Sequence, residues 1–437
     1  MAKKTKAADF SIEEKLEQAL VVTGYEPYKI PDNWCWTNLK TVCNLDNGIK
    51  HNNESLAYFD AKTLREITEP VSRNSGVIVE KGQKVILVDG ENSGEVFVIP
   101  DRGYMGSTFR ILNISKQFDE MYIRYFIDIF REELKKNKIG SAIPHLNKEL
   151  FYGLQFPLPP LPEQHRIVER IESLFSKLDE AKEKAQEVID SFETRKAAIL
   201  HKAFSGELTA KWREENGVGI ESWERKTLGE VCNSIFDGDH MPPPKSESGI
   251  PFLVISNVND GYLSFENTRF VPQEYYDAIT DTRKPEKGDV LYTLVGSFGI
   301  PVVVDTNVPF CFQRHMALLK PKSINTYFLW YLLQSQEMYQ KASSIAKGVA
   351  QLTVPIKGLR LMDFNCPSEE EQIEIVRILD SLLEKEDTSK DNAESIIDQI
   401  ETMKKAILAR AFRGELGTND PEEESAVELL KQILSGE

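Results

Sequence analysis

The sequence lacks the features that are typical of secreted, membrane-spanning or zinc-binding proteins. Its five cysteines, Cys35, Cys43, Cys232, Cys311 and Cys366, form no C-x-x-C pair and have no histidine pair nearby, which argues against a disulfide framework and a zinc site. No apolar run approaches the roughly 18 residues that a membrane span needs. The lysine-rich start has no apolar stretch behind it, so it is not a secretory signal. We expect reduced cysteines and a cytoplasmic protein.

Familiar catalytic motifs are also missing. The chain contains no G-x-x-x-x-G-K-[ST], G-x-G-x-x-G, G-x-S-x-G or H-E-x-x-H, and no Asn or Asp followed by Pro-Pro and an aromatic residue. The nearest approach to a metal site is the segment 237–242 (DGDHMP), where two carboxylates and a histidine share a loop. Because such a loop is more often a turn, we expect no catalytic residue, no metal and no cofactor on this chain.

The net charge of −16 is unevenly distributed along the chain. Residues 367–437 contain 8 basic and 19 acidic residues, whereas residues 30–158 contain 16 and 17, and residues 220–366 contain 14 and 16. A nearly neutral domain can present one basic face to phosphates, since the local field decides the attraction. The acidic total therefore does not exclude nucleic-acid binding.

The sequence repeats itself once. Trp34, Leu39 and the run Val42-Cys43-Asn44 recur as Trp223, Leu228 and Val231-Cys232-Asn233. Later, residues 193–209 (ETRKAAILHKAFSGELT) align with residues 401–417 (ETMKKAILARAFRGELG), with 11 of 17 positions identical. A period of about 190 to 208 residues is the size of a domain plus a connector rather than of a solenoid repeat.

Each copy is predicted to be a mixed α/β domain followed by one long helix. Short apolar runs at 85–88, 96–99, 290–295 and 302–304, punctuated by Gly and Pro, predict strands. Aromatic and leucine residues at three- and four-residue spacing predict helices over 120–136 and 325–343.

The connectors are predicted to be coiled-coil helices. The first seam runs over Ile167, Ile171, Leu174, Leu178, Ala181, Ala185, Val188, Phe192 and Ile199, interrupted by Arg195. The second runs over Ile375, Leu379, Leu382, Ala393, Ile396, Ile400, Met403 and Ile407, interrupted by Glu386 and Ser389. A helix of about 43 residues is roughly 65 Å long, and a domain with a radius of gyration of about 14 Å cannot carry the chain back over that length. We therefore expect antiparallel helices and a pseudo-twofold, dumbbell-shaped molecule.

These features together resemble the specificity subunits of type I restriction-modification systems. The resemblance rests on P-x-x-x-E-Q before each helix (Pro159, Glu163, Gln164 and Pro367, Glu371, Gln372) and on AILxxAFxGEL at each helix end (198–208 and 406–416). The segments 287–291, 296–299 and Asp237-Gly238-x-His240 also look like the family's target recognition domains, with Asn47-Gly48 and His51 in the first copy. The resemblance covers essentially the whole chain.

The resemblance implies a non-catalytic DNA reader. Two homologous target recognition domains would each read one half of a bipartite, asymmetric site in double-stranded DNA, and the paired helices would set the gap. The family's partners would be two DNA methyltransferase subunits, which bring S-adenosylmethionine, and restriction subunits, which bring ATP and Mg²⁺. Their docking surfaces would lie on the helices, before Trp34 and between Gly206 and Trp223.

Arginine and lysine in polar loops are the best candidates for contacts with DNA, because guanidinium pairs bidentately with guanine and either residue holds phosphate. The candidates are Lys50, Arg73, Lys84, Arg102 and Arg110 in the first domain and His240, Lys245, Arg283, Lys284, Arg314 and Lys347 in the second. The alternative for each is a solvated or ion-paired surface cation. The stretches 140–145 and 348–351 are further candidates to approach DNA.

We divide the chain into an N-terminal segment (1–29), a first domain (30–158), a first helix with linker (159–219), a second domain (220–366), a second helix (367–417) and an acidic C-terminal tail (418–437). Two alternatives stay open for the function. One is a coiled-coil scaffold whose domains bind protein rather than DNA, with which the acidic tail is compatible. The other is a nuclease or methyltransferase with an unfamiliar motif.

Overall fold

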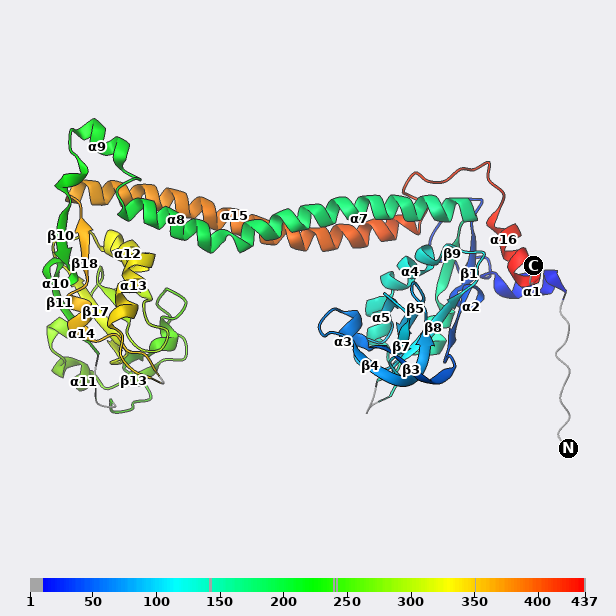
Figure 1. Ribbon diagram of the computed structural model, residues 1–437, viewed down its shortest axis with the longest axis horizontal. Coiled ribbons are helices and arrows are strands. Elements are labelled where there is room, and N and C mark those ends of the chain that lie inside the picture. Colours follow the sequence, from blue (N-terminus) through cyan, green and yellow to red (C-terminus); the bar gives the residue numbers. More distant parts are fainter. Residues whose placement is uncertain (1–10, 141–143, 239, 241–242, 350, 436–437) are drawn as a thin grey trace. The chain divides into compact units, whose positions relative to one another are not determined.

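The computed structural model describes residues 11–140, 144–238, 240, 243–349 and 351–435. The chain forms two compact units: unit 1 contains Met1–Lys184 and Ile396–Glu437, and unit 2 contains Ala185–Ser395. Each unit combines sheets with helices (Figure 1). Within the described part of the chain, no helix is both long enough and apolar enough to cross a bilayer.

Unit 1 is built on one four-stranded antiparallel sheet and a small barrel. The sheet has the order β2 (Cys43–Asp46), β8 (Phe109–Ile114), β5 (Lys84–Leu87), β6 (Val96–Val98). The barrel consists of β3 (Lys50–Phe59), β4 (Val71–Val79) and β7 (Gly103–Met105), and β1 (Cys35–Asn38) pairs separately with β9 (Gln155–Leu158). The strands predicted at 85–88 and 96–99 correspond to β5 and β6.

Unit 2 repeats this plan in the same chain order. Its four-stranded antiparallel sheet has the order β11 (Cys232–Asp237), β17 (Met316–Pro321), β14 (Val290–Thr293), β15 (Pro301–Val303). The second sheet contains β13 (Arg269–Val271), β12 (Ile250–Leu253) and β16 (Cys311–Phe312), and β10 (Glu224–Thr227) pairs with β18 (Asp363–Cys366). The mixed α+β class and the internal duplication are thus confirmed.

Helices pack on these sheets, and several are shorter than the periodicity predicts. The helix predicted over 120–136 divides at Phe130 into α4 (Glu120–Ile129) and α5 (Arg131–Lys136), and the helix predicted over 325–343 divides at Ser335 into α12 (Thr326–Gln334) and α13 (Gln336–Ile345). The short helices are α2 (Leu39–Val42), α3 (Ala61–Leu64), α6 (Lys148–Gly153), α9 (Ala210–Asn216), α10 (Leu228–Val231), α11 (Gln273–Ala278) and α14 (Ile356–Arg360). None of the five cysteines, all of which lie in the described part of the chain, forms a disulfide, and all five are buried.

The long helices pair antiparallel within each unit. They are α7 (Leu161–Asp190), α8 (Phe192–Phe204) and α15 (Glu369–Ala411), so the first predicted helix is interrupted at Ser191. In unit 1, Lys182 bonds Glu401 at 2.9 Å and Lys404 bonds Asp179, so the numbering of one helix falls as the other rises. In unit 2, Arg195 bonds Glu386 at 2.6 Å.

Of the 17 residues predicted for the two seams, eight are buried, six are half-buried and three are exposed. Ile167, Ile171, Ala185, Phe192, Ile375, Leu379, Ala393 and Ile400 are buried as predicted. Leu383 is buried more deeply than the predicted Leu382, and Ala181, Ile396 and Met403 lie on exposed faces. The polar interruptions Arg195 and Glu386 face each other, so the apolar seam is broken by an ion pair rather than by two unrelated residues.

A buried glutamate fixes the start of each long helix. In unit 1 the indole N–H of Trp34 donates to Glu163 at 2.7 Å, and the side chain of Asn419 donates to the same oxygen at 2.9 Å. In unit 2 the indole N–H of Trp223 donates to Glu371 at 2.8 Å. Each carboxylate therefore joins the first residues of a globular domain to the long helix that follows that domain.

The glutamine of each P-x-x-x-E-Q motif ties the same helix to the sheet-covering helix. The amide of Gln164 donates to the Pro159 carbonyl at 3.0 Å and accepts from the Asp119 N–H at 3.0 Å. Gln372 does the same with Pro367 and Asn325, at 3.0 and 2.8 Å. Asp119 and Asn325 are the N-cap residues of α4 and α12. The motif is therefore structural in both copies.

The segment expected to be an acidic tail is partly folded. It contains α16 (Ala426–Ser435), in which Ala426 and Leu430 are fully buried in the core of unit 1. This helix lies against α1 (Ile12–Ala19), which comes from the predicted N-terminal segment. Arg166 of α7 also binds both carboxylate oxygens of Glu423 at 2.8 Å. The segment folds despite its acidity because its apolar residues share one helical face.

A charged cluster of unit 1 lines a hollow between residues of α4 and of α15. Asp128 faces Arg124 at 3.8 Å, and Arg131 binds Glu95 at 2.6 Å. Burial raises the pKa of Asp128 to about 6, although Arg124 opposes the shift. The Asp128 carboxylate is therefore held in its charged form at neutral pH at a cost to stability.

Replacing Trp34 by Phe should destabilise unit 1, because it removes a hydrogen-bond donor from a buried carboxylate. We expect a loss of about 2 kcal/mol in the free energy of unfolding, measured by urea denaturation. Trp36→Phe is the matched control: the Trp36 indole N–H is also buried but has no partner among the described residues. Equal losses in the two variants would contradict the role given to Glu163.

Asp128→Asn should stabilise unit 1 at neutral and alkaline pH. The raised pKa means that the folded protein binds the Asp128 proton more tightly than the unfolded chain, so wild-type stability falls as pH rises from about 4 through 6. The variant lacks this titration and should gain about 1 to 2 kcal/mol at pH 8 but nothing near pH 4. Thermal melting across this pH range, with the exposed Asp391→Asn as control, measures the gain. A gain independent of pH would show that titration of Asp128 is not its cause.

Candidate nucleic-acid interface

Three of the five cations predicted in unit 1 line one concavity. Lys50 on β3, Arg73 on β4 and Arg110 on β8 surround a hollow of about 510 Å³ on the barrel side of the sheet. The neutral polar side chains that line it are Asn47, Asn52, Ser75 and Ser107, and among the described lining residues none is acidic. This is a surface that attracts anions and offers hydrogen bonds.

Arg73 and Arg110 are held in different ways. The guanidinium of Arg73 stacks 3.4 Å from the centroid of the Tyr58 ring. Nη1 of Arg110 donates to the carbonyls of Ser107 and Phe109 at 3.2 and 2.7 Å, and its Nε is buried with no partner in the part of the chain described. Stacking covers one face of the Arg73 guanidinium and leaves its N–H groups able to donate. Arg110 has fewer N–H groups left to donate, because Nη1 is already bonded and Nε is buried.

The structure does not bring Lys84 and Arg102 into this hollow. Lys84 is paired with Glu120 at the start of α4, and only 12% of its side chain is exposed. Arg102 binds both oxygens of Glu54, at 2.6 and 3.1 Å, and reaches Glu80 at 3.2 Å. The hydrogen bonds that Arg102 donates, chiefly those to Glu54, raise its pKa. Lys84 and Arg102 are therefore ion-paired surface cations, which is the alternative given above for each candidate. Arg102 neutralises the charge of Glu54 on β3.

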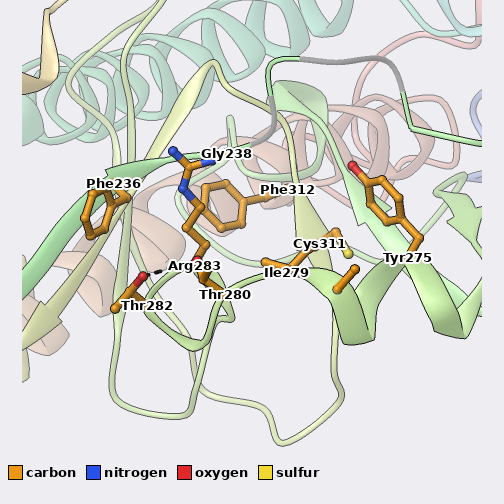
Figure 2. A pocket seen from close by; sticks show the side chains of 10 residues that line it. Phe236, Gly238, Tyr275, Ile279, Thr280, Thr282, Arg283, Cys311 and Phe312 are labelled. Carbon is orange, nitrogen blue, oxygen red and sulfur yellow. Dashed lines mark hydrogen bonds between the residues drawn. The ribbon is translucent and has the colours of Figure 1, made fainter.

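In unit 2, Arg283 lines a hollow of about 530 Å³ together with aromatic side chains. Figure 2 shows the Arg283 side chain extending between the rings of Phe236 and Phe312 in this view. Its guanidinium lies 5.7 Å from the Phe236 centroid and 3.7 Å from a carboxylate oxygen of Asp237. The neighbouring Lys284 is paired with Asp281 at 3.1 Å and is 21% exposed, so it contributes less to this surface.

His240 and Arg314 line a second, smaller hollow of about 340 Å³ in unit 2. His240 Nε2 lies 2.8 Å from Asp237, which also faces Arg283 and so joins the two hollows. Burial, with the charge of Arg314, lowers the pKa of His315, so this ring is neutral at pH 7. Arg314 itself is exposed, and none of the described residues forms an ion pair with it.

The remaining candidates lie at the edge of this region or outside it. Lys347 is exposed at the base of a hairpin in which its backbone exchanges hydrogen bonds with Thr353, at 2.9 and 2.8 Å. Lys245 is exposed in the loop before β12. Residues 141–143 and 350 of the candidate stretches, and 239, 241 and 242 of the DGDHMP segment, lie outside the described residues.

The hollow lined by Lys50, Arg73 and Arg110 and the hollow lined by Arg283 occupy equivalent places in the duplicated fold. Each is bounded by the turn after the first strand of the main sheet and by the strand β7 or β16. A Cβ added to Gly48 would collide with Val77, and one added to Gly238 would collide with the Phe312 carbonyl, so both turns need glycine. The linings differ: cationic and polar in unit 1, aromatic with one arginine in unit 2.

Sequence reasoning missed the neutral members of these surfaces. Tyr58, Asn52 and Ser75 of unit 1 and His315 of unit 2 belong to no recognisable motif, whereas Gln351 lies in the stretch 348–351 that was predicted to approach DNA. The available signal was the unusual polarity of 50–54 (KHNNE) and 72–75 (SRNS), which were not predicted as strands and lack the alternating apolar residues of a half-buried strand, although the structure places them in β3 and β4.

Comparisons with known proteins bear on this geometry. The family model described as "Type I restriction modification DNA specificity domain" matches residues 31–190 and 220–401. The chain is 25% identical over 445 residues to the EcoBI specificity subunit of Escherichia coli, with 92% of both chains covered. It is 28% identical over 358 residues to the MjaVIII specificity subunit of Methanocaldococcus jannaschii, covering 78% of this chain and 81% of that one.

Solved structures share the fold. A chain solved to explain complex assembly and conformational transition of the type I R-M system aligns with a TM-score of 0.68 and 22% identity, covering 89% of this chain and 100% of that one. The HsdS subunit from Thermoanaerobacter tengcongensis aligns with a TM-score of 0.61 and 22% identity, covering 90% and 100%. At this level of identity the likeness shows the architecture alone.

Proposed function

The chain belongs to the type I restriction-modification DNA specificity family, and from this membership we propose that it is the non-catalytic reader of a bipartite, asymmetric site in double-stranded DNA. Each globular domain reads one half of the site, and the paired long helices set the number of base pairs between the halves. The observation that carries this proposal is the pair of equivalent hollows with different linings. Two hollows at equivalent positions of a duplicated fold match a DNA site with two halves. Their different linings match halves that differ in their bases.

The cations divide by their role in this proposal. Lys50, Arg73 and Arg110 in unit 1, and Arg283, His240 and Arg314 in unit 2, contact DNA from the hollows. Lys245, Lys284 and Lys347 supply phosphate contacts at the margins, and Lys84 and Arg102 position other groups. Phosphate contacts set affinity and register, whereas contacts with base edges set the sequence.

Catalysis in this proposal belongs to partner chains. Two methyltransferase subunits dock on the long helices and on the segments before Trp34 and after Gly206, and they bring S-adenosylmethionine. Restriction subunits join through them and bring ATP and Mg²⁺. The specificity chain holds no cofactor of its own and acts on DNA in the cytoplasm.

Base-resolved methylation mapping tests the proposal. DNA from cells that express this chain with its methyltransferase partner should carry a split motif with a fixed gap of unspecified bases, and DNA from cells with the methyltransferase alone should not. Co-purification of the two subunits is the control for assembly. An assembled complex that leaves no split motif would contradict the reader function and favour a scaffold.

Arg314→Ala should weaken DNA binding by the assembled methyltransferase complex. The loss should be about 1 to 3 kcal/mol on the cognate site alone if Arg314 reads a base, and equal on all sequences, with a smaller salt dependence, if it holds a phosphate. Fluorescence anisotropy at several salt concentrations separates the two cases. Arg131→Ala, which removes an arginine of unit 1 that is paired with Glu95 at 2.6 Å, is the control. Unchanged binding by Arg314→Ala would remove this residue from the interface.

A further inference from the structure

The strands β3 and β4 form an antiparallel ribbon that is much longer than its counterpart in unit 2. β3 has 10 residues and β4 has 9, whereas β12 and β13 have 4 and 3. Residues 50–53 and 71–75 are exposed. In Figure 1 the ribbon lies on the side of unit 1 away from α7. An exposed ribbon of this length is costly unless it binds something, because its faces bury little apolar surface.

The exposed part of the ribbon is almost entirely polar and carries positive charge. It presents Lys50, His51, Asn52, Asn53, Ser72, Arg73, Asn74 and Ser75. The one acid within it, Glu54, has both carboxylate oxygens bound by Arg102, so its charge is neutralised. Amide, hydroxyl and guanidinium groups are the side chains that pair with base edges, and an adjacent basic surface suits phosphates.

The ribbon is irregular where these side chains gather. The pairing slips between Asn52 and Leu56, and Asn53 in the bulge has a φ of 78°. A bulge increases the local twist of a ribbon and redirects its side chains. Beyond the bulge, Leu56 pairs with Arg73 and Tyr58 pairs with Val71. Tyr58 thereby comes under the guanidinium of Arg73, at 3.4 Å.

We propose that the β3–β4 ribbon enters the major groove of the DNA half-site read by unit 1 and that Arg73, stacked on Tyr58, reads a guanine there. This inference rests on the proposed reader function and deepens it. The major groove is about 12 Å wide and admits a two-stranded ribbon, and an arginine pairs bidentately with O6 and N7 of guanine. The Tyr58 ring covers one face of the guanidinium and leaves the N–H edge free to meet a base edge.

The other cations of the hollow are less suited to this role. Nη1 of Arg110 already donates to two carbonyls, and its Nε is buried. Lys50 has no planar fork, so it suits a phosphate better than a base. Arg73 is exposed, and none of the described residues accepts a hydrogen bond from its N–H groups. Among the described cations that line this hollow, Arg73 is therefore the one whose guanidinium is both open and pre-oriented.

Unit 2 cannot read a base in the same way. The pairing of β12 with β13 and β16 matches that of β3 with β4 and β7, and it aligns Tyr58 with Phe252 and Arg73 with Val271. Phe252 and Val271 are 3% and 1% exposed and belong to a small apolar core. The guanine contact therefore belongs to one half-site only.

Methylation mapping with variants of the full chain, co-expressed with the methyltransferase partner, tests the inference. The wild-type motif should contain a guanine in one half, and Arg73→Ala should make that one position degenerate while the other half is unchanged. Cognate binding by the purified complex should weaken by roughly 5- to 150-fold, the range of one bidentate pair. Arg73→Lys keeps the charge but not the fork, so it should also lose the preference for guanine.

Changes at two further positions separate base reading by Arg73 from a general loss of charge or of folding. Tyr58→Phe keeps the ring and should keep the motif, whereas Tyr58→Leu should weaken the guanine preference. Arg131→Ala removes an arginine that pairs with Glu95 on another face of unit 1 and should leave the motif unchanged. Thermal melting shows whether each variant folds.

The outcomes are distinct. An unchanged motif with Arg73→Ala, or an equal loss of methylation at all sites, overturns base reading by Arg73 while the reader function stands. Degeneracy at an A·T position overturns the assignment to guanine. A wild-type complex that assembles but gives no split motif overturns the reader function, and the inference falls with it.

Discussion

Two glutamates buried at the starts of the long helices are the constraint on which the rest of the structure depends. Glu163 and Glu371 are 0% and 1% exposed. A carboxylate can be removed from water only if donors replace its hydration. Each receives one donor from a tryptophan at the start of a globular domain and others from the segment that follows a long helix. Three segments distant in sequence must therefore meet at one point, and this fixes where each domain joins its helix.

The two units satisfy this constraint with different chemistry. In unit 2, Arg213 supplies a cation to Glu371 at 2.6 Å, whereas in unit 1 the donors to Glu163 besides Trp34 are the neutral Asn419 and Thr418. Unit 1 instead recruits more of the C-terminal segment, through Arg166 and Glu423 and through α16. The acidic end of the chain is thus part of the domain, and its charge is not evidence for a scaffold that captures basic partners.

The sequence allowed the frame to be predicted because the frame is periodic and duplicated. Four of the eight main-sheet strands, β2, β8, β11 and β17, were not predicted. The long helices, the other main-sheet strands and the cations Lys50, Arg73 and Arg110 follow from local patterns. The interruptions at Phe130, Ser191 and Ser335 do not, because no Gly or Pro marks them. The ion pairs of Lys84 and Arg102 depend on carboxylates 36 and 48 residues away, which only the folded chain brings near.

A duplicated fold can carry two different DNA-reading surfaces because the residues that stabilise the fold are not the residues that face solvent. Glu163, Gln164 and their counterparts bond only to structural elements, whereas Arg73 and Arg314 stand on exposed positions. Exposed substitutions usually change stability by less than about 0.5 kcal/mol. Recognition can therefore change residue by residue on each unit while the buried bonds keep the sheets in place. The ribbon of unit 1 and the aromatic hollow of unit 2 are two solutions built on the same strands.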